Sequence, residues 1–435
     1  MIFDKLVKNF KNRLEEKFDG KPRADNASFK LSNVIMCGFA LFSLKDSSLL
    51  KFVNRFKNRK SNLYTIYKIT QSPSDSTMRA LLDNIETSEL KDEFKPNILA
   101  LDNQGVLDNY KYLNNYLYIP IDGTQYFKSK TIHCDNCLEM KHKNGEITYT
   151  HKGVCACIVK PETSVVFPIA IEDVSKQDGN TKNDCETNAT KRLIPQLVNT
   201  LPIDSDILIG GDALYCTGPM INLIKIENEK REGEIDFIFN IKPGSHGYLF
   251  SQFNSLEGDK IKIYTHETKD TKYVTKFCNG LILNKSNEDI LVNMLYFEEH
   301  NLKTGKVKIF SWATSITIVS RNYKKLVKIG RSRWKIENET FNTLKNQGYQ
   351  FEHNFGHGHN NLAANFGVLM LLAFLFDQIQ LATNKFFRMA KGKERTYKDL
   401  WEKIRHWFDE IKVDSMQTIY KIIAKILKIK VELIN

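Results

Sequence analysis

Three acidic residues occupy positions from which carboxylates could hold metal ions. Asp122 follows the apolar run YLYIPI (116–121), and Asp212 follows the run DILIGG (206–211). Both runs predict strands, and the carboxyl ends of strands are where an open sheet binds ligands. Glu337 lies far along the chain in a predicted helix, so only the fold can bring the three acids together.

Oxygen ligands of this kind suit Mg²⁺ or Mn²⁺. When a phosphodiester is attacked, two such ions about 3.5–4 Å apart activate the nucleophile and stabilise the departing oxygen. We predict that Asp122 bridges two ions and that Asp212 and Glu337 each hold one. Each acid taken alone could equally be a turn or capping residue, so the hypothesis depends on the three together.

A second set of residues has the spacing of a zinc site: Cys134, Cys137, His142 and His151. Their pattern is C-x2-C-x4-H-x8-H, and a C-x2-C pair followed by histidines is typical of zinc ligands. Asn144-Gly145 predicts a hairpin turn that would bring the two histidines together. We predict structural Zn²⁺ here, with His133 and Cys155 as spare ligands; the alternative is buried side chains without metal.

Other polar residues near these motifs receive structural interpretations. His353, His357 and His359 follow the helix of Glu337 among glycines, which predicts a turn. We interpret the segment as a polar connection between helices, with a DNA-facing loop as the alternative. Asp184 and Glu186 are interpreted as capping acids at a helix start, outside the metal site.

The net charge of the 435 residues is +12. The excess is clustered in Lys51, Arg55, Lys57, Arg59 and Lys60, and again in Lys385, Arg388, Lys391, Lys393, Arg395 and Lys398. Phosphate contacts provide most non-specific affinity for nucleic acid. The clusters therefore favour a nucleic-acid partner over a protein that is merely basic.

The N-terminal sequence has the charged, amphipathic pattern of a helix and lacks the apolar core of a signal peptide. The longest apolar stretch, 362–376, is interrupted by Asn365 and is short for a bilayer. We predict that it is a buried core helix. We therefore expect no membrane association, a cytoplasmic location and reduced cysteines.

The order of predicted elements indicates an α/β fold with a mixed sheet flanked by helices. Residues 1 to about 112 predict helices, one of which starts at Ser72–Asp75. Strands are then expected at 116–121, 154–159, 164–171, 206–210 and 236–241, and helices at about 184–198 and 220–226. Residues 244–320 contain four strand patterns, and helix returns from Tyr323.

The motifs together resemble a known family. The fragments are IDGTQYF (121–127), HCDNC (133–137), QDGNTKNDCETNATKR (177–192), GGDALY (210–215), RWKIENETFNTLK (333–345) and EHNFGHG (352–358). Over about residues 30–380 the chain resembles bacterial insertion-sequence transposases of the DDE (RNase H-like) superfamily, in particular the group with a β-rich insertion and a Tyr/Arg/Glu/Lys signature helix. The RWKIEN segment is the most specific of these motifs.

The resemblance implies an RNase H-like fold and roles for particular residues. Asp122, Asp212 and Glu337 match the three metal-binding acids. Arg333 matches the signature Arg, and at four residues from Glu337 it shares that face of a helix, where it could clamp a phosphate. Lys345 resembles the signature Lys, one position further from the glutamate than usual.

Three further positions in this segment are less clear from sequence. The expected slot of the signature Tyr is Gly330, and the nearest tyrosine is Tyr323. Trp334 is either a stacking residue for a flipped base or a core residue. Glu339 is a competing acid that is expected to face away from Glu337.

We divide the chain into five regions on this basis. They are a helical N-terminal region for DNA binding or dimerisation (1–112), the first part of the catalytic domain (113–243), the β-rich insertion (244–320), the completion of the catalytic domain (321–380) and a helical C-terminal region (381–435). The expected activity is cleavage and strand transfer at the ends of an insertion sequence. The expected partners are terminal inverted repeats and target DNA, bound by a homodimer at the bacterial nucleoid.

Two alternatives remain from sequence alone. A related metal-dependent nuclease would use the same acids without joining DNA. An inactivated, transposase-derived DNA-binding protein is the other, although a decayed copy would be expected to have lost one of the three acids.

Overall fold

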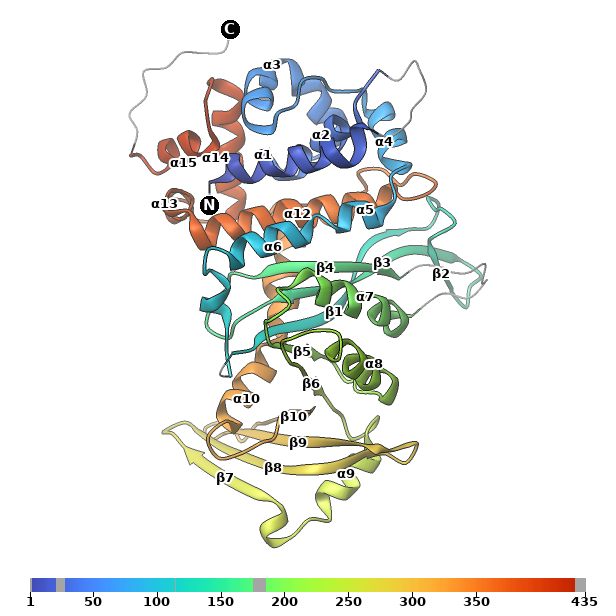
Figure 1. Ribbon diagram of the computed structural model, residues 1–435, viewed down its shortest axis with the longest axis vertical. Coiled ribbons are helices and arrows are strands. Elements are labelled where there is room, and N and C mark those ends of the chain that lie inside the picture. Colours follow the sequence, from blue (N-terminus) through green and yellow to red (C-terminus); the bar gives the residue numbers. More distant parts are fainter. Residues whose placement is uncertain (1, 21–27, 114, 175–184, 427–435) are drawn as a thin grey trace.

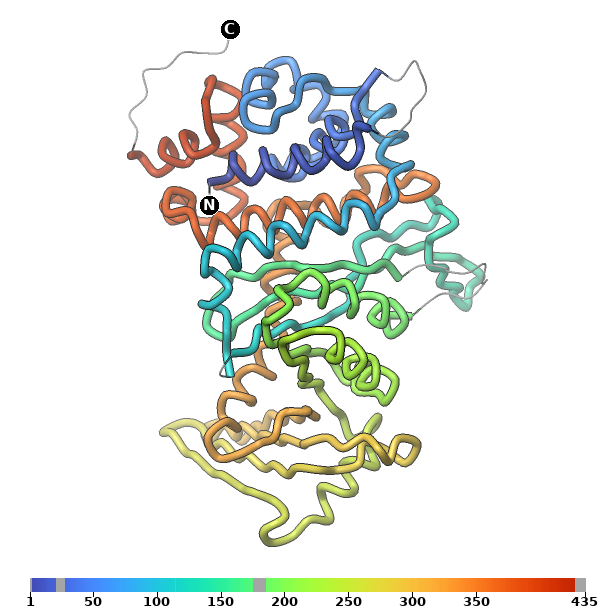
Figure 2. Tube along the Cα trace, viewed as in Figure 1, coloured from blue at the N-terminus to red at the C-terminus, as the bar shows by residue number. Residues whose placement is uncertain are grey.

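The computed structural model describes residues 2–20, 28–113, 115–174 and 185–426. Figure 1 shows three levels along the long axis: helices at one end, a sheet flanked by helices in the middle, and long antiparallel strands at the other end. The helical level contains both the N-terminal and the C-terminal helices (Figure 2). The chain is therefore a mixed α/β protein, as predicted.

One mixed sheet runs through the middle and the strand-rich end. Its strands are β1 (Leu117–Ser129), β2 (Leu138–Lys141), β3 (Ile147–Ile158), β4 (Phe167–Val174), β5 (Ile207–Gly211), β6 (Ile235–Asn240), β7 (Lys262–Glu267), β8 (Thr271–Asn284), β9 (Asn287–Asn301) and β10 (Val307–Thr314). The order is β2-β3-β1-β5-β6-β10-β9-β8-β7, and β4 also pairs with β3. β1, β5 and β6 are parallel, whereas β3 is antiparallel to β1.

The four strands predicted within residues 244–320 are present, and they extend the same sheet. Trp312 to Thr314 of β10 pair antiparallel with Asn240 to Ile238 of β6. β9, β8 and β7 then follow as antiparallel neighbours. Residues 262–314 therefore continue the central sheet beyond β6.

Helices cover the central strands, which explains their uniformly apolar sequences. Every residue of β5 is buried, as expected for a strand covered on both faces. β4 packs against both α7 (Glu186–Thr200) and α12 (Leu362–Thr383), and α8 (Gly218–Asn228) packs on β6. α9 (Gly247–Asn254) packs on β8, and α10 (Tyr323–Arg331) contacts β6 and β9.

The long apolar helix α12 organises the helical level. Its composition would allow a membrane span, but 89% of its most apolar window is buried inside the protein, so the predicted core helix is confirmed. Packed around it are α1 (Phe3–Leu14), α2 (Leu31–Ser43), α4 (Asp75–Asp83), α5 (Thr87–Lys91) and α13 (Lys385–Lys393). The remaining helices of this level are α3 (Leu49–Tyr67), α6 (Phe94–Asp102), α14 (Tyr397–Glu410) and α15 (Met416–Ile423).

The two arginines of the first basic cluster do not belong to an exposed cationic surface, whereas Lys51, Lys57 and Lys60 are exposed. Arg59 is fully buried in α3, where its guanidinium bonds to the carboxylates of Asp46 and Asp409. Arg55 lies 3.7 Å and 3.6 Å from the same two carboxylates. These arginines join α3 to α14, because opposite charge is what allows a guanidinium to be buried.

Candidate active site and metal centre

Asp122 and Asp212 lie side by side because their strands are neighbours in register. The parallel pairing of β1 with β5 runs from Leu117 with Ile207 to Pro120 with Gly210. Each aspartate is two residues beyond the last pair, and neighbouring strands lie about 4.8 Å apart. β1 continues past its predicted end at 121, because Ile121 to Ser129 pair with β3, so Asp122 lies within the strand.

Glu337 reaches this edge of the sheet from an irregular helix. The predicted helix 333–345 is a 3-10 turn, η4 (Ser332–Trp334), followed by a π-helix, η5 (Ile336–Phe341), and the short α11 (Asn342–Asn346). η5 contacts β1. π-helical turns are rare and often occur at functional sites, because they shift side chains out of the ordinary helical register.

Arg333 links two of the three acids directly. Its Nη1 donates to Asp122 Oδ2 at 2.7 Å, and its Nη2 donates to Glu337 Oε1 at 2.8 Å. The guanidinium thus holds together two carboxylates from distant parts of the chain. The spacing of four residues between Arg333 and Glu337 was a sequence signal for this contact.

Burial raises the pKa of Asp122 to about 7, and the negative charge of Glu337 adds to this effect while Arg333 opposes it. The Asp122 side chain is 19% exposed and that of Glu337 is 48% exposed. Crowded carboxylates of this kind are stabilised in their charged form by a cation. The donor atoms are all oxygens, which fits a hard divalent ion.

A fourth acid, Glu186, lies at the same edge. A Cβ on Gly123 would come within 2.7 Å of the Glu186 carboxyl carbon, so the carboxylate rests on the backbone next to Asp122. Burial raises the pKa of Tyr215, and the charges of Glu186, Asp122 and Asp212 raise it further, so all three act on one phenol. Glu186 also lies in the first turn of α7, where the sequence predicts an acid at a helix start. The position of this helix after β4 is the only sequence signal for its approach to Gly123. Asp184 lies outside the described residues.

The other residues of the signature segment that the sequence analysis considered have different surroundings. Trp334 is 44% exposed, which rules out the core role. Lys345 forms an ion pair with Glu352 at 2.9 Å. Gly330 has no room for a tyrosine, since a Cβ there would lie 2.7 Å from the Trp312 ring.

Tyr323 and Glu339 lie away from the linked acids. Tyr323 stacks on Tyr264 of β7 with ring centroids 4.6 Å apart. Burial raises the pKa of Glu339, and Lys335 is the charge that opposes the shift. Tyr323 therefore belongs to the packing of α10 on the extended sheet.

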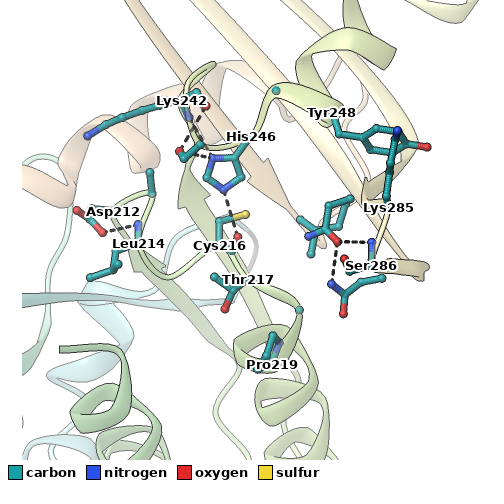
Figure 3. Close-up of a pocket in the computed structure, with 17 residues that line it drawn as sticks. Asp212, Leu214, Cys216, Thr217, Pro219, Lys242, His246, Tyr248, Lys285 and Ser286 are labelled. Atoms are coloured by element: carbon teal, nitrogen blue, oxygen red, sulfur yellow. Dashed lines mark hydrogen bonds between the residues drawn. The ribbon is translucent and has the colours of Figure 1, made fainter. Parts of the chain in front are cut away.

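A cavity of about 880 Å³ opens beside Asp212. It is bounded by the loop after β5, the loop after β6 and the turn between β8 and β9 (Figure 3). His246 donates from Nε2 to the Cys216 carbonyl at 3.2 Å and accepts at Nδ1 from Ser245. Lys242 and Lys285 line the cavity, and neither has an ion-pair partner among the residues that the structure describes.

Three of the four predicted zinc ligands lie together, and a different histidine takes the place of the fourth. Cys134, Cys137 and His151 cluster with His357, and their ligand atoms lie within 4.8 Å of one another. His142 is excluded and bonds instead to Thr148 at 2.8 Å. The reason is the hairpin register: Leu138 pairs with Thr150, which leaves His151 at the base with the cysteines and His142 at the turn.

The spare ligands and the remaining histidines have other surroundings. His133 stacks on Tyr149 with centroids 4.3 Å apart, and burial raises the pKa of Cys155 well above its usual value. His353 packs edge-on against Phe355. His359 donates its backbone amide to Asp83. The interpretation of residues 353–359 as a polar connection thus overlooked His357.

No protein-family model matches the sequence, and no curated protein is similar to it in sequence. Among solved structures, the chain resembles the piggyBac transposase in its synaptic complex with hairpin DNA. The likeness covers 97% of this chain and 78% of that one, with a TM-score of 0.40 and 10% identical residues.

Proposed function

We propose that this chain is a DNA transposase of the DDE type, with an RNase H-like catalytic domain that cleaves DNA and transfers the free strand. The observation that supports the proposal is that Arg333 bonds to both Asp122 and Glu337, and that the strand of Asp122 neighbours the one before Asp212. We propose that these three acids, which come from distant segments of the sequence, serve one chemistry.

Asp122, Asp212 and Glu337 are the residues that would hold Mg²⁺ or Mn²⁺, and Glu186 adjoins them. When bound, two such ions supply activation of a water or 3′-hydroxyl nucleophile and stabilisation of the leaving oxygen. The chain's own contribution is to hold the acids in place. Arg333 fixes Glu337 against Asp122, and its guanidinium is close enough to turn to a phosphate when DNA arrives.

The cavity beside Asp212 supports the approach of DNA from the side of the extended sheet. Lys242 and Lys285 line it without an acidic partner in the described part of the chain, and lysines of this kind bind phosphate backbones. Trp334, exposed next to Arg333, offers an aromatic face to an unstacked base. We propose that the DNA partners are element ends and target, held by a homodimer at the nucleoid in the cytoplasm.

The experiment is cleavage of a supercoiled plasmid that carries the flanking ends of the element. With Mg²⁺ we expect nicks at the ends and joined products, and with EDTA neither, because the acids act through divalent ions. Cleavage without joining would identify a nuclease. Binding of the ends without any cleavage in Mg²⁺ or Mn²⁺ would identify a DNA-binding relic and overturn the proposal.

Replacing both Lys242 and Lys285 by alanine is expected to weaken binding to every DNA sequence alike. Each lysine that contacts a phosphate contributes about 1 to the slope of log affinity against log salt, so the slope should fall by about 2. Titrations of labelled duplex at several salt concentrations measure it. Lys303→Ala/Lys306→Ala, in the β9–β10 turn away from the cavity, is the control; an equal loss in both double variants would contradict the role of the cavity.

A further inference from the structure

A second cluster of ligand atoms lies apart from the acids. Cys134 and Cys137 come from the loop between β1 and β2, His151 from β3, and His357 from the loop before α12. All four residues are buried, with at most 8% of their surface exposed. His357 is 220 residues from Cys137 in the chain, so the cluster is made by the tertiary fold.

The distances within the cluster match a tetrahedral zinc ion. Bonds of about 2.3 Å to sulfur and about 2.0–2.1 Å to nitrogen place two sulfurs about 3.8 Å apart, and sulfur about 3.6 Å from nitrogen. Here the two Sγ atoms are 3.9 Å apart, and His151 Nε2 is 3.4 Å from each of them. His357 Nε2 is 3.3 Å from Cys137 Sγ.

The surroundings hold these donors in place. The Cys137 amide donates to the Cys134 carbonyl at 3.1 Å, which closes a tight turn between the two cysteines. The His357 ring lies against Phe127, with centroids 4.3 Å apart. Two thiolates balance the charge of one Zn²⁺, so a buried site of this composition needs no further counter-ion.

We propose that the chain binds one structural Zn²⁺ through Cys134, Cys137, His151 and His357. The ion fastens the loop that follows the Glu337 segment to β3 and to the loop after β1, the strand that carries Asp122. A polar contact beside the cluster joins the same two segments: Asn136 Nδ2 donates to the Asn360 carbonyl at 3.0 Å. Zinc binding by these residues does not depend on the proposed enzymatic function.

The test is the metal content of the full chain, purified without chelators and measured by mass spectrometry. We expect one zinc per chain in the wild type. His357→Ala should bind zinc more than about 100-fold more weakly, since even the loss of a supporting residue around a zinc site costs about 10–100-fold. His142→Ala is the matched control: this histidine lies in the same hairpin outside the cluster and should leave the zinc content unchanged.

His357→Cys tests the same site if the alanine variant does not fold. Three cysteines and one histidine also bind zinc. This variant should retain one zinc per chain. Cobalt in place of zinc should give the visible bands of a tetrahedral ion and a thiolate charge-transfer band in the wild type. A wild type that contains no zinc and gives no such bands, or zinc lost with His142 and kept without His357, would overturn the proposal.

Discussion

Asp122→Asn is expected to abolish DNA cleavage while DNA binding persists. The substitution keeps the size of the side chain but removes a negative charge that would help to hold Mg²⁺ or Mn²⁺. Metal ions contribute several kcal/mol to stabilising charge in the transition state, and about 1.4 kcal/mol corresponds to tenfold in rate. We therefore expect cleavage to fall by about 10³-fold or more, measured as the initial rate of plasmid nicking.

The matched control is Glu339→Gln, which removes an acid two residues from Glu337 in the same irregular helix. Glu339 lies beside Lys335 and not at the Arg333 contact, so its removal should leave the nicking rate within a few-fold of wild type. Gel-shift titration of both variants checks that DNA binding is retained. Equal nicking rates in Asp122→Asn and wild type would exclude these acids as the catalytic centre.

Much of this site was predictable because its signals are local. Each aspartate follows an apolar run that belongs to a buried strand, and the pairing of the strands then determines where the acid lies. The helix predicted from Ser72–Asp75 begins at Asp75, with Ser74 accepting from the Thr77 amide. In each case a few adjacent residues determine the conformation, so sequence spacing is informative.

The wrong predictions have a common cause. Contacts between distant segments of the chain determine which of several residues of the same chemical type occupies a site. The sequence spacing predicts His142 as a zinc ligand, whereas the fourth ligand of the cluster, His357, is brought in by the loop before α12. Glu186 lies in the first turn of α7, as predicted for an acid at a helix start, but its approach to Gly123 of β1 depends on a long-range contact. The π-helix of η5 has no local signature, since it depends on how the segment packs on β1.

Among the residues whose surroundings differ from the prediction, Arg59 has the largest expected effect on stability. Its position in a run of basic residues suggested a DNA-binding face, but its guanidinium is buried between Asp46 and Asp409. Removing one partner of a buried pair leaves the other charge uncompensated, at a cost of about 3–5 kcal/mol. We expect Arg59→Met to lower the free energy of unfolding by this amount, measured by urea unfolding followed by circular dichroism.

Arg55→Met tests whether the loss of stability in Arg59→Met is caused by burial of the guanidinium or by its charge alone. Arg55 approaches the same two carboxylates at 3.7 Å and 3.6 Å, but its side chain is 38% exposed, and exposed pairs contribute about 0–1 kcal/mol. Its loss should therefore be small. Adding Asp46→Asn to Arg59→Met should recover part of the stability, because it removes one of the stranded charges. Equal destabilisation of Arg55→Met and Arg59→Met would show that burial of the guanidinium is not the cause of the effect.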